Sequence, residues 1–377
     1  MKIYSQYVIQ PPVRRHGLHR EKRDMRYYFA PLEGITGYVY RSIHHKHFPG
    51  VDRYYMPFIA PNYTMHLKQK EKQDVDPANN QGLAAVPQIL SNKADETLWA
   101  VEELSDRGYK EINLNLGCPM PTVARKKKGS GLLKYTDELD AYLDGVYNGL
   151  AKRQGECPPV RLSIKTRLGT DSTDEAERLV QIYNRYPVSE LIVHPRCQAD
   201  LYRGVPDREA FLLVLRESTN PVVYNGDLCC SEDVREIERA CREALLCETP
   251  PGEAEGSETP PGETKGSEIP RDEGKHSIDS VMIGRGLLAD PSLVRQCQGG
   301  VKVTAQELGA FHDDLYRCYK EILPGHKVVL NRMKELWSYM GKLFPEGAKC
   351  LKEIRKAGTE AQYEAAVRVL LSTCRVQ

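Results

Sequence analysis

The residues best placed to do chemistry lie at the end of one apolar run, in the stretch from Ile112 to Pro119. This stretch reads Ile-Asn-Leu-Asn-Leu-Gly-Cys-Pro, which predicts a buried strand that ends in a Gly-Cys-Pro turn. The turn places Cys118 at the carboxyl end of the strand, where the chemistry of barrel enzymes takes place. A thiol there can donate a proton to a substrate held over a cofactor. Because free cysteines are often buried, a purely structural Cys118 is the alternative.

Lys165 is the second informative residue, because it directly follows Leu162-Ser163-Ile164 in another apolar run. An unpaired ammonium at such a position costs free energy, and a ligand that gains negative charge would remove that cost. Other apolar runs end in side chains that could either form hydrogen bonds within the protein or contact a ligand. These are Pro31, Leu32, Glu33, Gln88, Asn115, Arg167, His194 and Arg196. A buried histidine is more often a core residue than a catalytic one.

The last two apolar runs end in glycine-containing turns, Asn225-Gly226-Asp227 and Gly284-Arg285-Gly286. Barrel enzymes often bind a phosphate with the loops after their seventh and eighth strands, together with the N-terminus of a short helix. Glycine lets the backbone approach such a ligand, and Arg285 adds positive charge. We therefore predict a phosphate site formed by these two turns.

Eight short apolar runs must position the residues at their ends. Most of the runs are continuous, as expected for strands that are covered on both faces. They occupy residues 27–34, 53–61, 84–90, 111–117, 161–169, 190–196, 221–227 and 280–286. Amphipathic segments that predict helices separate most of them, at 94–107, 136–152, 172–186, 207–216 and 231–246. The alternation predicts an α/β protein with a (β/α)8 TIM barrel. A doubly wound open sheet is the rival, but its Gly-x-Gly-x-x-Gly turn does not follow an early strand.

Composition divides the chain into parts. Residues 1–26 form a basic tail with seven Lys or Arg and two Asp or Glu, and residues 27–300 hold the predicted barrel. Within the barrel, residues 248–277 repeat an acidic decapeptide rich in Pro and Gly almost three times, which predicts a disordered insert. Residues 301–377 have helical spacing and contain thirteen basic and nine acidic residues. We predict a small C-terminal helical domain there, and the two basic parts are compatible with a polyanionic partner.

The eleven cysteines are irregularly spaced and form no paired Cys-x-x-Cys motifs, so we expect no metal site. Cys229 and Cys230 are adjacent, which is unsuited to an ordinary disulfide and favours a reducing cytoplasm. No apolar run reaches the roughly 18 to 20 residues of a membrane span, so we expect no membrane association. We also expect a monomer.

Seven motifs, in one order, resemble those of the tRNA-dihydrouridine synthase family. They are Ala-Pro-Leu-Glu-Gly at 30–34, Val-Pro-Gln at 86–88, Asn-Leu-Gly-Cys-Pro at 115–119, Ile-Lys-Thr-Arg-Leu-Gly at 164–169, Val-His-Pro-Arg at 193–196, Asn-Gly-Asp at 225–227 and Met-Ile-Gly-Arg-Gly at 282–286. The resemblance implies an FMN-binding barrel whose helical C-terminal domain, at 301–377, helps to hold tRNA. It also implies that specific uridines in tRNA are reduced to 5,6-dihydrouridine, with NADPH or NADH reducing the FMN.

The resemblance also implies roles for individual residues. Cys118 resembles the proton donor to C5 of the uracil, which receives a hydride from flavin N5 at C6, and Lys165 would stabilise the reduced flavin. The implied FMN contacts are Pro31, Leu32, Glu33, Gln88, Lys165, His194, Asn225, Gly226, Asp227, Gly284 and Arg285. Asn115 resembles the amide that reads the target uracil. The other candidates for substrate binding are Arg167, Arg196 and the basic run Lys126, Lys127 and Lys128, which we interpret as a phosphate clamp.

The sequence departs from the family pattern at Gly37, where Asp is common, so we expect one hydrogen bond near the entrance to be missing. Two other functions fit the same residues. A dihydroorotate dehydrogenase-like FMN enzyme would act on a free pyrimidine, but the basic helical domain and the lysine run disfavour it. An RNA-binding paralogue without catalytic activity is disfavoured by the intact Cys118 and Lys165.

Overall fold

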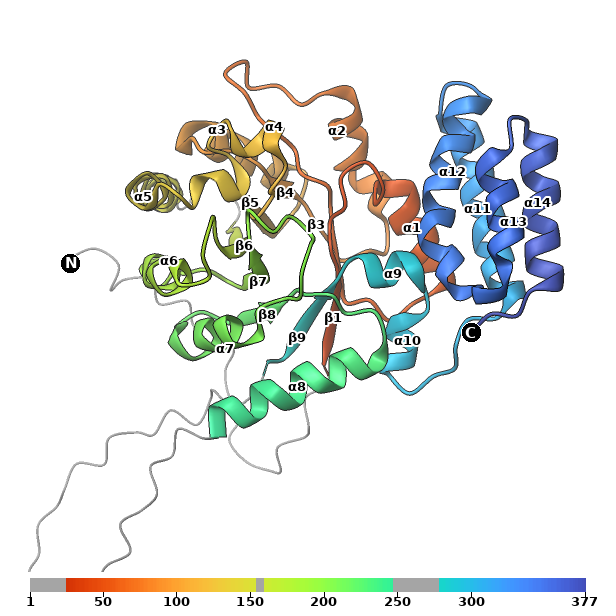
Figure 1. Cartoon of the computed structure of the whole chain (residues 1–377). Coiled ribbons are helices and arrows are strands. Elements are labelled where there is room, and N and C mark those ends of the chain that lie inside the picture. Colours follow the sequence, from red (N-terminus) through yellow and green to blue (C-terminus); the bar gives the residue numbers. More distant parts are fainter. Residues whose placement is uncertain (1–24, 154–158, 247–277) are drawn as a thin grey trace, which may run out of the picture.

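The computed structural model describes residues 25–153, 159–246 and 278–377. The predicted acidic insert at 248–277 and all but the last two residues of the basic tail at 1–26 lie outside the described residues. Figure 1 shows a barrel ringed by helices, with a separate group of C-terminal helices packed beside it.

The barrel is built from parallel strands that follow one another around a ring. They are β1 (Arg26–Phe29), β2 (Arg53–Tyr55), β3 (Ala85–Val86), β4 (Gln88–Ile89), β5 (Glu111–Leu116), β6 (Arg161–Gly169), β7 (Leu191–Cys197), β8 (Val222–Tyr224) and β9 (Ser280–Ile283). The hydrogen-bonded order is β3-β2-β1-β9-β8-β7-β6-β5-β4. Each of the eight predicted apolar runs contributes to this ring.

Pro87 explains why nine strands are recorded where eight were predicted. It separates β3 from β4, and a proline has no N–H with which to continue a ladder. Its carbonyl still accepts a hydrogen bond from the Asn113 N–H at 2.9 Å, so the chain remains part of the sheet at this point. Because β3 and β4 are the two ends of the recorded order and are consecutive in the chain, the sheet nearly closes. The predicted (β/α)8 TIM barrel is confirmed.

Helices cover the outside of the ring, as Figure 1 shows. The longer ones are α1 (Tyr38–His47), α3 (Ala94–Asp106), α5 (Thr136–Lys152), α6 (Glu175–Tyr183), α7 (Arg208–Glu217) and α8 (Ser231–Leu246). The short ones are α2 (Gln69–Asp74), α4 (Pro121–Ala124), α9 (Arg285–Ala289) and α10 (Leu293–Cys297). Helix α6 begins later than the predicted residue 172, because the Glu175 carboxylate accepts the backbone N–H groups of Asp171 and Ser172 and holds them in a turn.

An ionic cluster closes the amino-terminal end of the barrel. Arg53 pairs with Glu111 at 2.9 Å and with Glu190 at 2.7 Å, and Tyr28 donates to Glu190 at 2.8 Å. Above this cluster, the inner faces of the strands fill the barrel with buried side chains, namely Tyr28, Ala30, Tyr55, Val86, Ile192, Val223 and Met282. The opposite, carboxyl-terminal end is therefore the end that can accept a ligand.

Four helices follow the barrel, namely α11 (Ala305–Ile322), α12 (His326–Met340), α13 (Ala348–Lys356) and α14 (Glu360–Thr373). Thr304 and Thr359 form capping boxes at the starts of α11 and α14. The group is joined to the barrel through α1, where Phe311 packs edge-on against Tyr40 and Phe48, and Asp314 pairs with Lys46 at 2.6 Å. An apolar and ionic contact of this kind fixes the orientation of the helices beside the barrel.

Among the described helices, none combines the length and the apolar character needed to cross a membrane. The described residues also contain no group of three His, Cys, Asp or Glu side chains arranged to hold a metal ion.

Candidate active site

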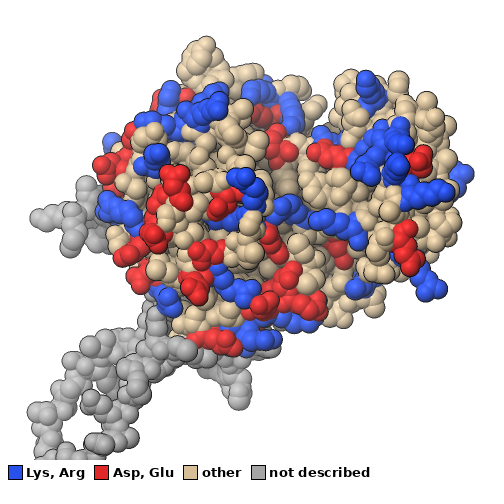
Figure 2. All heavy atoms as spheres, viewed as in Figure 1, with Lys and Arg blue, Asp and Glu red and all other residues tan. Residues whose placement is uncertain are grey.

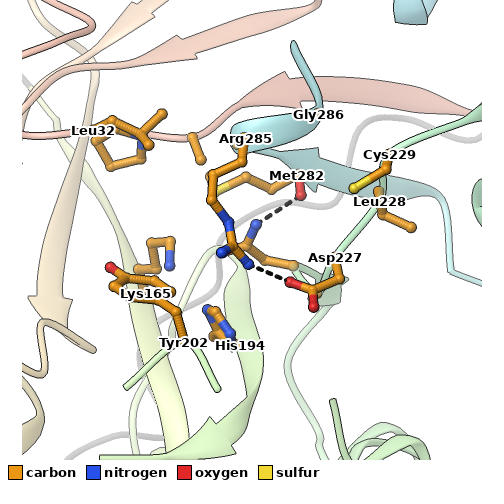
Figure 3. Close-up of a pocket in the computed structure, with 15 residues that line it drawn as sticks. Leu32, Lys165, His194, Tyr202, Asp227, Leu228, Cys229, Met282, Arg285 and Gly286 are labelled. Atoms are coloured by element: carbon orange, nitrogen blue, oxygen red, sulfur yellow. Dashed lines mark hydrogen bonds and ion pairs between the residues drawn. The ribbon is translucent and has the colours of Figure 1, made fainter. Parts of the chain in front are cut away.

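A pocket opens at the carboxyl ends of β1 and β6 to β9, and the close-up in Figure 3 shows its lining. Nine of the predicted FMN contacts line it together, namely Pro31, Leu32, Lys165, His194, Asn225, Gly226, Asp227, Gly284 and Arg285. The fold thus brings residues that are more than 250 positions apart in the chain to one place. Their role as FMN contacts remains a prediction.

Lys165 lines the pocket from the inner face of β6. Burial lowers the pKa of its ammonium to about 7, with a further contribution from the nearby Arg167 guanidinium. Among the described residues, its amine has no hydrogen bond and no carboxylate partner. A cation held in this way is available to an anionic group that enters the pocket.

His194 is neutral in this environment, because burial and four nearby cations lower its pKa well below the usual value. Its Nε2 lies 3.0 Å from Nη1 of Arg196. Since a guanidinium only donates hydrogen bonds, Nε2 must be the acceptor, which leaves the proton on Nδ1. The ring therefore offers the pocket a neutral N–H donor.

Asp227 organises the cationic side of the pocket. Its carboxylate accepts two hydrogen bonds from Arg196, at 3.0 and 2.5 Å, and one from Arg285 at 2.6 Å. Burial by itself would raise the pKa of this carboxyl, but the two arginines outweigh it and keep the pKa below its usual value. Figure 3 shows the Arg285 side chain reaching across the pocket toward Asp227.

Glycine is required at two of the pocket turns by close packing. A Cβ on Gly286 would lie 2.0 Å from the carbonyl oxygen of Leu228, and one on Gly226 would lie 2.6 Å from the hydroxyl of Tyr224. The Gly286 contact shows that the turns after β8 and β9 pack directly against each other, and both turns line the pocket.

Cys118 stands at the end of β5 and is half-buried. Its N–H and that of Gly117 donate to Oδ1 of Asn115 at 2.9 and 3.1 Å, which fixes the turn. Nε of Arg167 donates to the Gly117 carbonyl at 2.9 Å, and Ser130 donates to the Cys118 carbonyl. Burial raises the pKa of the thiol, although the Met120 backbone and Lys165 oppose this effect. The sulfur is therefore protonated at neutral pH, as a proton donor must be.

Four predicted site residues form hydrogen bonds within the protein, namely Gln88, Asn115, Arg167 and Arg196. Gln88 is buried and does not line the pocket; it donates to Asn113 and accepts from Nδ2 of Asn115 at 2.8 Å. Arg167 also donates from Nη1 to the Cys197 carbonyl and from Nη2 to the Leu201 carbonyl, both at 2.7 Å. Arg196, besides its bonds to Asp227, donates to two carbonyls of the loop after β7.

Two other predictions concern the rim. Glu33 does not line the pocket and instead pairs with Lys70 at 3.1 Å. In the basic run, Lys127 pairs with Glu138 and Lys128 with Glu96, whereas Lys126 is exposed and has no ionic partner among the described residues.

Sequence reasoning missed several lining residues, namely Tyr202, Leu228, Cys229 and Met282. Tyr202 is the most informative, because its ring lies 5.2 Å from the Arg285 guanidinium and 5.4 Å from that of Arg167. It comes from the loop after β7, eight residues beyond His194, and no local pattern marks it. Met282 could have been found from strand alternation, since it is the inward residue before Gly284.

The start of α1, next to Gly37, forms a hydrogen bond with another part of the chain. Oδ1 of Asp74 accepts the Tyr38 N–H at the start of α1 at 2.7 Å. A Cβ on Gly37 would lie 3.5 Å from the same oxygen. Asp74, which also pairs with the buried Arg41, therefore caps α1 in place of a side chain at position 37.

These features define a (β/α)8 barrel with a cation-lined pocket and a protonated thiol at the end where barrel enzymes do their chemistry. Comparison with protein families matches residues 28–245 to the dihydrouridine synthase (Dus) model. The match covers more than half of the chain, which therefore belongs to the dihydrouridine synthase family.

Curated relatives are consistent with this assignment. The chain is similar to tRNA-dihydrouridine synthase B of Vibrio vulnificus (strain CMCP6), with 26% identity over 229 residues that cover 59% of this chain and 66% of the relative. It is also similar to tRNA-dihydrouridine synthase B of Pasteurella multocida (strain Pm70), with 26% identity over 212 residues, 56% of this chain and 61% of the relative. The chain thus spans just under two thirds of the length of these relatives.

Proposed function

We propose that this chain reduces specific uridines in tRNA to 5,6-dihydrouridine, with FMN in the pocket and NADPH or NADH as the reductant. The observation that carries the proposal is the pairing of a protonated thiol, Cys118, just after β5, with the Lys165 amine on the inner face of the neighbouring strand β6. Among the described residues this amine has no hydrogen-bond partner. Membership of the dihydrouridine synthase family and the names of the curated relatives support it.

The residues of the pocket fit FMN. The Lys165 amine lacks a carboxylate partner among the described residues, so an electron-rich ring would satisfy it. Arg285 and the backbone of the two glycine turns offer donors to a phosphate, and Asp227 keeps Arg285 in place. When bound, FMN would supply the hydride that reduction of the uracil requires.

Lys165 and His194 would hold the cofactor by charge and by hydrogen bonding, respectively. The ammonium form of Lys165 becomes favourable once negative charge lies beside it, because that charge raises its depressed pKa. His194 remains neutral, so it can donate from Nδ1 without adding positive charge to an already cationic pocket.

Cys118 would donate the proton that the uracil takes up at C5. Its thiol keeps its proton at neutral pH, and the turn that carries it is fixed from both sides by Asn115 and Arg167. We assign Arg167 as a positioning residue on these contacts, because all its described bonds go to backbone carbonyls. Asn115 has one amide N–H beyond its bond to Gln88, which keeps it a candidate for uracil recognition.

The basic surfaces would bind the tRNA backbone. Figure 2 shows Lys and Arg side chains gathered over the upper part of the barrel and on the C-terminal helices. Within the basic run, Lys126 would contribute most, because it has no ion pair with any described residue, whereas Lys127 and Lys128 are paired with acidic residues. We extend the proposal to a monomer that works in the cytoplasm, where its substrate resides.

A flavin reoxidation assay tests the proposal. The purified protein should be yellow, and NADPH or NADH should bleach it under anaerobic conditions. Adding tRNA that lacks dihydrouridine should restore the flavin absorbance and produce dihydrouridine, whereas orotate should do neither. Reoxidation by orotate would establish the dihydroorotate dehydrogenase-like alternative, and a colourless protein that binds tRNA would establish the inactive paralogue.

A further inference from the structure

The loop between β2 and α2 presents an aromatic side chain to solvent at the carboxyl-terminal face of the barrel. Tyr63 is 85% exposed, which makes it one of the most exposed large apolar residues of the described chain. Its ring has no ring, cation or hydrogen-bond partner among the described residues. In Figure 1 this loop, which leads into α2, projects beyond the neighbouring helices. A tyrosine that contributes nothing to the core is available for contact with a partner.

The loop is held in a defined shape. Glu71, which is only 13% exposed, accepts the Ala60 N–H at 3.2 Å and the Lys68 N–H at 2.8 Å, so one carboxylate clamps both ends of the loop. At the tip, Oδ1 of Asn62 accepts the Thr64 N–H at 2.9 Å. Tyr63 lies between these two residues, so its backbone is fixed before any partner arrives.

One feature of the loop stores conformational strain. Met65 adopts a left-handed conformation, with a φ of 48°, which non-glycine residues seldom adopt. Buried Pro61 and Leu67 anchor the two sides of the loop to the barrel. Strain in a clamped loop with an exposed tip is typical of segments that are shaped for binding.

The surroundings of the loop indicate the chemistry of the partner. Lys68, Lys70 and Lys72 follow the tip directly, and the first two are 69% and 73% exposed in their side chains. Lys70 pairs with Glu33, which follows the pocket residues Pro31 and Leu32, so the loop borders the pocket side of the barrel mouth. An exposed aromatic ring that is followed in the chain by three exposed lysines suits single-stranded nucleic acid, in which bases stack and phosphates pair with cations.

We propose that Tyr63 is a stacking platform for an unpaired base next to the target uridine of the RNA substrate. This inference rests on the proposed function and names a substrate contact of the same barrel mouth. The flanking base would stack on the Tyr63 ring, while Lys68 and Lys72 contact the backbone phosphates. Because the loop is clamped by Glu71, the stacked base would hold the RNA at a fixed distance from Cys118.

The test compares Tyr63→Ala, Tyr63→Phe and the control Glu217→Ala, which removes an exposed side chain at the end of α7, outside the surfaces proposed to bind tRNA. A tRNA transcript with 2-aminopurine beside the uridine that the wild-type enzyme modifies reports stacking as fluorescence quenching. We expect Tyr63→Ala to weaken tRNA binding and kcat/KM by about 5-fold to 100-fold and to lose the quenching. Tyr63→Phe and Glu217→Ala should behave as the wild type does, and flavin reduction by NADPH should be unchanged in all three.

The outcomes separate the two proposals. Wild-type binding, turnover and quenching by Tyr63→Ala would overturn the stacking platform while leaving the proposed function intact. A wild-type protein that modifies no uridine in tRNA would overturn the proposed function itself. Equal losses in Tyr63→Ala and Tyr63→Phe would also overturn stacking, because Phe keeps the ring and removes only the hydroxyl.

Discussion

Replacing Lys165 by methionine should have opposite effects on the flavin-free and the flavin-bound protein. In the flavin-free protein, the pKa of Lys165 is about 7, against 10.5 for an exposed lysine. Between these two values the unfolded chain binds more protons than the folded one, so the free energy of unfolding rises with pH. Lys165 therefore destabilises the flavin-free fold, and it does so fully below pH 7.

The size of the effect follows from the shift. Each pKa unit corresponds to about 1.4 kcal/mol, so the whole displacement corresponds to roughly 5 kcal/mol. Water that reaches the pocket lessens this cost, and we expect Lys165→Met to stabilise the flavin-free protein by about 2 kcal/mol at pH 7. The gain should shrink as the pH rises toward 10.5, because folded wild-type Lys165 is then neutral and the free-energy cost of removing its proton falls as the pH approaches the pKa of an exposed lysine.

Urea denaturation of flavin-free wild type and Lys165→Met at pH 7, 8 and 9 measures this difference. FMN titration of the same proteins should show weaker binding to the variant, most of all for reduced FMN, which is the electron-rich form. A stability difference that does not change with pH, or an unchanged affinity for reduced FMN, would refute the assignment of Lys165 as an available pocket cation. Arg53→Met, which breaks the ionic cluster at the far end of the barrel, should instead destabilise the flavin-free protein.

Two further predictions concern the turn and the rim. Arg167→Met removes the bond to the Gly117 carbonyl and should reduce dihydrouridine formation about 10-fold to 100-fold with FMN still bound; loss of FMN in proportion to activity would show that Arg167 holds the cofactor instead. Lys126→Ala should weaken tRNA binding and lower the slope of log K against log salt by about 1, whereas Lys127→Ala, which removes a paired lysine, should change it less. Equal slopes for Lys126→Ala and the wild type in filter binding would remove Lys126 from the RNA contacts.

The strands of the barrel could be predicted because continuous apolar runs and glycine-rich tips follow directly from burial on both faces. The same reasoning could not predict the break at Pro87. A proline within an apolar run is compatible with an edge strand or a bulge as well as with an interrupted strand. The reasoning also could not anticipate that Asp74 caps α1, because the compensating carboxylate lies 37 residues beyond Gly37.

The sequence predicted which short residues at the ends of the strands line the pocket, but it did not predict where the long side chains of the site extend. Short residues such as Asn225 and Gly226 lie where the backbone puts them, so the pocket could be outlined from motifs alone. The guanidiniums of Arg167 and Arg196 instead extend to carbonyls of distant loops, which no spacing rule reveals. Tyr202 was missed for the same reason, because its position depends on the path of the loop after β7.

The measurement that bears most directly on the central claim is the turnover of Cys118→Ala on tRNA that lacks dihydrouridine. This variant should bind FMN and accept electrons from NADPH as the wild type does, yet form no dihydrouridine, because no other described thiol stands at the end of β5. Cys118→Ser should be similarly inactive, since a hydroxyl is a far weaker acid. Normal dihydrouridine formation by Cys118→Ala would contradict the claim that this thiol supplies the proton.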